Sequence, residues 1–164
     1  MTEGGNHMEL FKTERTIIQS FNSEYINDFM TYHNNDEWMQ FQGFKNLTRA
    51  EYETELLKDF SLEEGSQLAI IKKDINLLVG DIFLKEVTNS LFVGYTISPK
   101  FSKQGYATEV LLGIIDWAKQ KTFSDISAYV EIENLASINL LKKTGFSEVP
   151  DSEEEGEILF KFYL

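Results

Sequence analysis

The chain has 164 residues, of which 42% are hydrophobic and 13% aromatic, enough for one packed domain and too many for a disordered chain. It contains no cysteine and only two histidines, which excludes disulfides, thiolate zinc sites and a thiol nucleophile, and we expect no metal site. The net charge of −12 argues against nucleic acid as a partner and favours cationic partners such as amines, although solubility alone explains it equally well.

The first seven residues, "MTEGGNH", look unlike the rest of the chain. We expect residues 1–7 to be disordered or left over from expression, with Met8 as the natural start of a single domain over residues 8–164. No basic segment followed by an apolar stretch opens the chain, and no apolar run is long enough to span a membrane. These patterns predict a cytoplasmic protein with no membrane partner.

The first third of the chain predicts one strand and two helices. The strand covers residues 15–21, "RTIIQSF". A helix follows over residues 23–33, because its apolar residues and His33 recur at helical spacing. A second helix over residues 48–60 begins at Thr48, and Glu51 three positions later completes a capping box.

The remainder predicts a meander of three strands over residues 66–73, 76–87 and 90–98, since only short turns separate them. Next come a long amphipathic helix from about Tyr106, a strand over residues 126–132, a helix over residues 134–146 and a last strand over residues 157–164. This order predicts an α/β (α+β) fold with a central mixed, mostly antiparallel sheet flanked by about four helices. Strands 90–98 and 126–132 should run parallel, because a helix connects them.

The loop before the long helix has the composition of an anion site. A helix amino terminus exposes unpaired N–H groups and carries a partial positive charge, which suits a phosphate. Gly105 and Ala107 allow close approach to the backbone, and Lys103 and Gln104 add donors. Alternatively, Gly105 only permits the turn into the helix.

Two motifs together give a more specific indication. The loop reads Ser102-Lys103-Gln104-Gly105-Tyr106-Ala107, and "NLASINLLKKTGF" over residues 134–146 carries Asn134, Ser137, Lys143, Gly145 and Phe146. With "TERTIIQSF" from Thr13, these segments resemble the GNAT acetyltransferase superfamily and, within it, the RimJ/RimL-like branch. The resemblance covers nearly the whole chain from Thr13 onward.

The resemblance implies acetyl-CoA as co-substrate, bound in a split between the fourth and fifth predicted strands, which are residues 90–98 and 126–132. The family pattern assigns the pantetheine contacts to the backbone of Tyr95, Thr96 and Ile97. It assigns the pyrophosphate to the loop residues Ser102, Lys103, Gln104, Gly105, Tyr106, Ala107 and Thr108, and further CoA contacts to Asn134, Ser137 and Lys143. Ser102 stands where many members have Arg or Gln, so backbone amides should carry most of this contact.

Candidate catalytic residues follow less directly. Leu141 stands where many members have a tyrosine that protonates the departing thiolate, which leaves Ser137 as the next candidate, unless Ser137 only bonds its own helix. Glu131 is the candidate proton acceptor, with Asp81 and Glu86 as weaker ones, although a solvated outer face is the favoured explanation of Glu131. The oxyanion donor would be an amide of strand 90–98 near a bulge.

The acceptor pocket is expected between the first two helices, where the family places it. Its candidate residues are His33, Trp38, Phe41 and Phe44, for which core packing is an alternative. The implied reaction is direct acetyl transfer to a primary amine, with the α-amino group of a protein N-terminus as the expected acceptor. A polyamine or aminoglycoside is the alternative acceptor, and a catalytically silent acyl-CoA-binding module is the alternative class. The protein would be a monomer or a homodimer.

Overall fold

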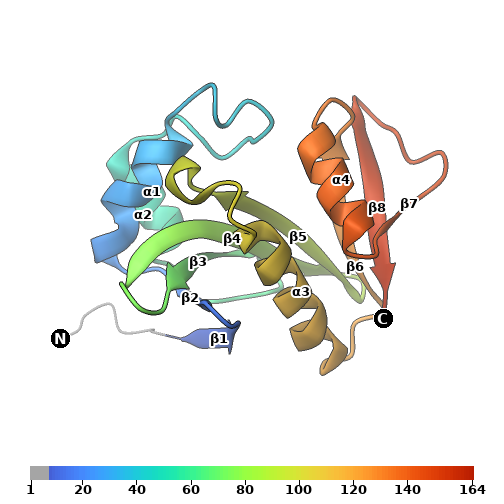
Figure 1. The fold of residues 1–164 in the computed structure, drawn as a ribbon, viewed down its shortest axis with the longest axis horizontal. Helices are drawn as coiled ribbons and strands as arrows, with labels where there is room; N and C mark the ends of the chain where they lie inside the picture. The colour runs from blue at the N-terminus through green and yellow to red at the C-terminus, as the bar shows by residue number, and fades with distance from the viewer. Residues whose placement is uncertain (1–7) are drawn as a thin grey trace.

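The structure is a computed structural model that describes residues 8–164, in which eight strands form one sheet in the order β1-β2-β3-β4-β5-β6-β8-β7 (Figure 1). The expectation for residues 1–7 lies outside the described residues. All strand pairs are antiparallel except β5 and β6, which run parallel. The strands are β1 (Glu9–Lys12), β2 (Thr16–Ser20), β3 (Ser66–Lys72), β4 (Leu77–Val87), β5 (Ser90–Ile97), β6 (Asp125–Glu131), β7 (Ser147–Glu148) and β8 (Glu157–Tyr163).

The helices divide between the two faces of this sheet, and each pair covers its own hydrophobic core. On one face lie α1 (Ile26–His33), entered through the short turn η1 (Ser23–Tyr25), and α2 (Arg49–Leu56). On the other lie α3 (Tyr106–Lys119), entered through η2 (Pro99–Phe101), and α4 (Leu135–Lys143). Strand β3 shows the alternation directly, because Leu68 and Ile70 join the α3 core while Ala69 and Ile71 join the α1 core.

The predicted fold class, the meander and the parallel pair joined by a long helix are confirmed. The sequence did not reveal β1 and β7, which have four and two residues and so carry almost no periodic signal. The second helix ends at Leu56, earlier than predicted. Leu56 packs in the core under α1, whereas Phe60 and Leu62 pack against the opposite core, so the chain must leave the helix to reach the other face.

The sheet splits between β5 and β6, the fourth and fifth strands of the sequence prediction. These strands pair only over Ser90–Phe92 with Asp125–Ser127, near their amino-terminal ends. Beyond that point β5 stays with β4, whereas β6 stays with β8, and the two halves separate (Figure 1). The split therefore leaves one edge of β5 without a strand partner over its last residues.

Candidate functional site

The backbone alternation in β5 determines which groups face the split. The amide of Ser98 donates to the carbonyl of Val79 at 2.8 Å, and β4 and β5 pair without a register shift. Bonded residues alternate in an antiparallel ladder, so Thr96 directs its backbone groups toward β4, while Tyr95 and Ile97 direct theirs toward the split. Of the three residues expected to contact the pantetheine arm through the backbone, Thr96 is therefore turned away. The expected bulge is also absent from the β4–β5 pairing.

The loop at the start of α3 is a concave array of free amides. Within the described part of the chain, no backbone N–H from Lys103 to Thr108 has a hydrogen-bond acceptor. Lys103 and Gly105 have left-handed conformations, with φ of 60° and 84°, which points successive amides to one side. Gly105 is the residue at which α3 begins, so the positive end of the helix adds to this array. The geometry fits a pyrophosphate held mainly by backbone.

A charged network joins residues 13–15 to the first turn of α3, just after this loop. Glu109 in the first turn of α3 accepts hydrogen bonds from Thr13 Oγ1 at 2.6 Å, from Arg15 N at 2.8 Å and from Arg15 Nε at 2.6 Å. Burial alone would raise the pKa of Glu109, but these bonds outweigh it and lower the pKa below its usual value. The Arg15 guanidinium also lies 3.9 Å from the centroid of the Tyr106 ring. The "TER" segment of the sequence is thus tied to the loop helix.

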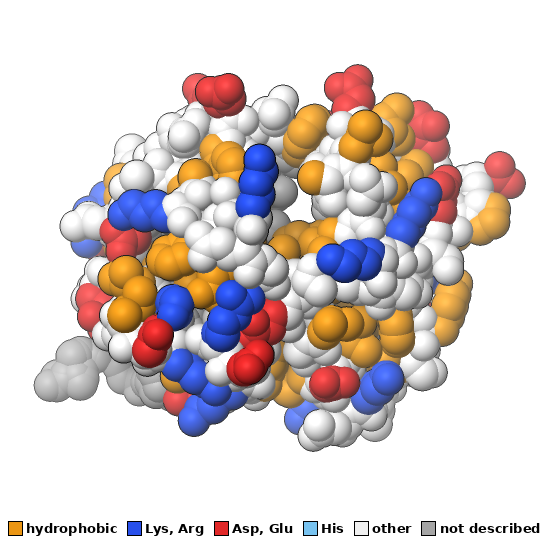
Figure 2. Space-filling view, in the orientation of Figure 1, with side chains coloured by type: hydrophobic (Ala, Val, Ile, Leu, Met, Phe, Trp, Pro, Cys, Tyr) orange, Lys and Arg blue, Asp and Glu red, His pale blue; other side chains and the backbone are white. Residues whose placement is uncertain are grey.

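A cleft of about 340 Å³ occupies the split between β5 and α4. Figure 2 shows the molecule hollowed between its two halves, with Lys and Arg side chains around the hollow. Asn134 caps α4 by accepting from the amide of Ser137 at 3.3 Å, and both residues line the cleft. From the opposite wall, Trp38 Nε1 donates to the carbonyl of Ile97 at 2.9 Å, so one of the β5 groups that face the split is already bonded. The other lining residues are Glu37, Gln40, Phe41, Gln42, Tyr95, Thr96, Ala107, Ala136 and Leu140.

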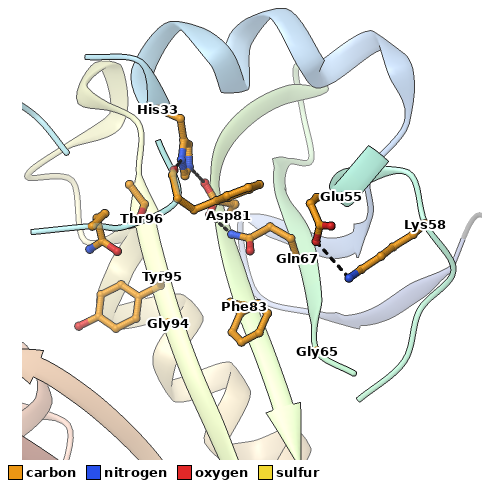
Figure 3. A pocket seen from close by; sticks show the side chains of 12 residues that line it. His33, Glu55, Lys58, Gly65, Gln67, Asp81, Phe83, Gly94, Tyr95 and Thr96 are labelled. Carbon is orange, nitrogen blue, oxygen red and sulfur yellow. Dashed lines mark hydrogen bonds and ion pairs between the residues drawn. The ribbon is translucent and has the colours of Figure 1, made fainter. Parts of the chain in front are cut away.

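A second pocket of about 350 Å³ lies beside α1, α2 and the meander (Figure 3). The rings of Phe44 and Phe83 form the aromatic part of its wall, whereas Tyr95 lines it with its ring directed away from Asp81 and Phe83. Glu55 and Lys58 form an ion pair at 3.1 Å on its α2 side. The remaining lining residues are His33, Gln42, Gly65, Gln67, Asp81, Gly94 and Thr96.

A buried hydrogen-bond network forms the polar wall of this second pocket. Asp81 is 1% exposed and accepts from Gln67 Nε2 at 2.5 Å and from the Tyr32 hydroxyl. His33 places Nε2 2.7 Å from Asp81 Oδ2 and Nδ1 2.5 Å from the Phe44 carbonyl oxygen. Burial, together with the charge of Asp81, raises the pKa of Tyr32 well above its usual value, so Tyr32 remains a donor.

The partners of His33 determine how many protons this network holds. The Phe44 carbonyl can only accept, so Nδ1 carries a hydrogen. Two lone pairs would repel at 2.7 Å, so one further proton lies between Nε2 and Asp81 Oδ2. Neither His33 nor Asp81 is therefore free to take a proton from an incoming ammonium without breaking the network.

The two cavities meet at β5. Gln42, Tyr95 and Thr96 line both the cleft and the second pocket. The Tyr95 hydroxyl lies 3.0 Å from Ser137 Oγ, so it reaches across the split from β5 to α4. One end of a molecule bound in the cleft and one end of a molecule bound in the second pocket would therefore meet at these shared residues.

The structure separates the predicted site residues into groups. His33 and Phe44 line the second pocket, whereas Trp38 and Phe41 line the cleft. Glu131, at the end of β6 opposite Glu157, lines neither cavity.

Three other predicted residues lie away from both cavities or inside the protein. Lys143 is exposed at the end of α4 and Glu86 near the end of β4, and neither lines a cavity. Leu141 is buried in the core. Sequence reasoning missed Gln42, Gln67 and the pair of Glu55 and Lys58, because no short motif links these segments. Only their positions after folding bring them together.

Comparison with known proteins agrees with this geometry. A family model of the acetyltransferase (GNAT) domain matches residues 15–147. The chain belongs to the GNAT family of acetyltransferases. Its class of activity is therefore acetyl transfer from acetyl-CoA. YoaA, an uncharacterised N-acetyltransferase of Bacillus subtilis, is 25% identical over 147 residues, which cover 85% of this chain and 83% of YoaA.

Solved structures share the fold at low sequence identity. A GNAT acetyltransferase from Bacillus anthracis has a TM-score of 0.81 and 20% identity, with 93% of this chain and 96% of that chain covered. The spermidine N-acetyltransferase of Vibrio cholerae, in complex with CoA and spermine, has a TM-score of 0.76 and 17% identity over 92% and 95% of the chains. RimL, a ribosomal L7/L12 α-N-protein acetyltransferase in complex with CoA, has a TM-score of 0.76 and 12% identity over 96% and 98%. These three likenesses show that the chain shares the fold of solved acetyltransferases.

Two further findings concern residues 8–164 alone. No group of three His, Asp or Glu side chains there is arranged to hold a metal ion. No helix there has both the length and the hydropathy needed to cross a membrane.

Proposed function

We propose that this protein transfers the acetyl group of acetyl-CoA to a primary amine, and that the acceptor is the α-amino group of a peptide or protein N-terminus. The observation that carries the proposal is the junction at Tyr95 and Thr96, where the cleft and the second pocket share lining residues. Acetyl-CoA occupies the cleft and the amine occupies the second pocket, which we call the acceptor pocket. Both reactants are then bound at once, and much of the rate comes from holding them together.

The chain's own groups would hold CoA as follows. The free amides from Lys103 to Thr108 receive the pyrophosphate. The backbone of Tyr95 and the amide of Ile97 face the split, where the pantetheine arm adds as an extra strand beside β5. Because Trp38 already bonds the Ile97 carbonyl, that carbonyl is not available to the arm unless Trp38 moves.

The chemistry needs a neutral amine that attacks the thioester carbonyl carbon. The C–N bond forms, the carbonyl electrons move to oxygen, and the C–S bond then breaks to release CoA. A β5 amide facing the split is placed to donate to the oxyanion. The ammonium proton passes to water at the pocket mouth, since the carboxylates of Asp81 and Glu55 are already bonded.

The bonds already made by the two carboxylates of the acceptor pocket favour an α-amine over a polyamine as the acceptor. A polycation needs several carboxylates that are free to pair with it. The acceptor pocket has two carboxylates in its lining, of which Asp81 is fully engaged and Glu55 is paired with Lys58. Its aromatic wall suits an amine that carries an apolar side chain next to it. The polyamine remains the second candidate, because the net charge of −12 attracts polycations.

A CoA-release assay tests this proposal without signal from protein thiols, because the chain has no cysteine to react with a thiol reagent. The acceptors are peptides with free N-termini, the same peptides blocked at the N-terminus but containing lysine, spermidine and an aminoglycoside. We expect turnover on the free N-termini only, with the acetyl group on the α-nitrogen by mass spectrometry. Turnover on spermidine alone would show that the acceptor is a polyamine and not a protein N-terminus. Tight acetyl-CoA binding without turnover on any amine would favour a catalytically silent binding module.

A further inference from the structure

Acetyl transfer leaves CoA as a thiolate that must take up a proton, and the cleft offers few groups to supply it. Of the cleft-lining residues, only Glu37 and Tyr95 have side chains that titrate, and Glu37 is exposed. In water a carboxyl group has lost its proton at neutral pH, whereas a phenol keeps it. Leu141 on α4 is 1% exposed in the core and has no proton to give. Tyr95 is therefore the one titratable cleft residue that carries a proton at neutral pH.

The position of Tyr95 fits this chemistry. It is one of the three residues that line both the cleft and the acceptor pocket, so it lies where the thioester must meet the amine. Figure 3 shows its ring directed away from Asp81 and Phe83. Its hydroxyl bonds Ser137 Oγ at 3.0 Å, across the split.

We propose that Tyr95 is the general acid of the reaction, giving its phenolic proton to the CoA sulfur as the C–S bond breaks, and that Ser137 is a positioning residue for Tyr95. This inference rests on the proposed function, because it assumes that acetyl-CoA occupies the cleft. It assigns to β5 a role that the sequence analysis gave to Ser137 on α4.

The proton balance closes without another reactant. The sulfur leaves with the C–S electron pair and takes the proton from Tyr95 Oη, forming the thiol of CoA. The tyrosinate then regains a proton through Ser137 Oγ from water, which also receives the proton that the attacking nitrogen loses. Overall, one N–H proton is lost and one S–H bond is made.

The environment of Tyr95 keeps it in the donor state. Burial raises its pKa, and the hydrogen bond with Ser137 offsets only part of that rise. A phenol is also a far better acid than the aliphatic hydroxyl of Ser137, so the proton comes from the residue that lies closer in acidity to a thiol.

Tyr95→Phe is the direct test, because it keeps the ring and removes only the hydroxyl. We expect kcat to fall by about 100-fold, the usual size of a general-acid contribution, while the Kd of acetyl-CoA stays within about twofold. We expect Ser137→Ala to lower kcat less than Tyr95→Phe does. Tyr129→Phe is the matched control, since Tyr129 is 57% exposed on β6 and lines neither cavity.

A second readout does not depend on turnover. The rate at which bound CoA is alkylated at sulfur, followed against pH, titrates the CoA thiol alone, because the thiolate is the reacting form and the protein has no cysteine. A hydroxyl that donates to sulfur stabilises the thiolate, so Tyr95→Phe should weaken the ionisation of the bound thiol by about tenfold or more. Tyr129→Phe should leave it unchanged.

Three outcomes would overturn the inference. One is an equal or larger kcat loss in Ser137→Ala, which would make the serine the acid. Another is a loss of CoA affinity in Tyr95→Phe with the thiol titration unchanged. The hydrogen bond between Tyr95 and Ser137 would then only hold the two sides of the cleft together. The third is unchanged kcat together with an unchanged titration. Failure of every amine to react would instead count against the proposed function, and the titration would still decide whether Tyr95 contacts the sulfur.

Discussion

Replacing Gly105 by valine should abolish tight CoA binding while the fold survives. Gly105 has φ of 84°, and a Cβ placed on it would meet its nearest atom, Arg15 Nη2, at 3.5 Å, which is an ordinary contact. The space is therefore available, but the backbone conformation is not suited to a β-branched residue. We expect residue 105 to leave the left-handed conformation, so that the amides of residues 103–108 no longer point to one side of the loop.

Gly156 provides a matched control for this change. Its φ is 85° and nothing lies within 4 Å of a Cβ placed on it, in a loop before β8 that lines neither cavity. The left-handed conformation costs a residue with a Cβ about 1–2 kcal/mol, so both valine variants should lose stability to a similar degree. At about 2–4 °C per kcal/mol for a chain of this size, each Tm should fall by roughly 2–8 °C.

Only the Gly105 variant should lose ligand affinity. One hydrogen bond from an amide to a charged group contributes about 1.5–3 kcal/mol, which corresponds to roughly a 10- to 150-fold change in Kd. Isothermal titration with CoA and thermal unfolding of both variants measure the two effects separately. If Gly105→Val bound CoA as tightly as Gly156→Val, the loop would not be the pyrophosphate site.

Three further changes probe the pocket, the cleft and the loop network. Asp81→Asn should cost about 3–5 kcal/mol in urea unfolding and raise the KM for the amine, because it breaks a buried charged network, whereas Glu55→Gln should cost under about 1 kcal/mol. Trp38→Phe removes the bond to the Ile97 carbonyl and should change the Kd of CoA by roughly fivefold, with no change in amine KM by steady-state kinetics. Glu109 has a lowered pKa in the folded state, so its stabilisation is full above its unfolded pKa of about 4.3 and is lost as the pH falls through the folded pKa. The Tm difference between wild type and Glu109→Gln should therefore be largest near neutral pH and shrink below about pH 4, and a difference that grew in acid would contradict this.

Local patterns were enough to predict most of the fold. The capping box at Thr48 forms as expected, and the free amides lie at the predicted start of α3. These features depend on residues close together in the chain. The parallel pairing of β5 with β6 also follows from the long helix between them.

The acceptor pocket could not be predicted in the same way. Its wall combines His33, Glu55, Gln67 and Asp81, which come from four separate elements or turns and share no motif. The sequence pattern made His33 and Asp81 separate candidates, and only the folded chain brings Nε2 of one within hydrogen-bond distance of Oδ2 of the other. Likewise, Glu131 follows a plausible strand pattern, but β6 pairs with β8 and carries it away from both cavities.

The central claim is that acetyl-CoA and the amine are bound together in two cavities that meet at Tyr95. Initial rates measured while both substrates are varied test it most directly. Direct transfer predicts double-reciprocal lines that intersect, because both reactants must be present before acetyl transfer. Parallel lines, together with an acetylated enzyme isolated in the absence of the amine, would show a covalent intermediate and contradict the account.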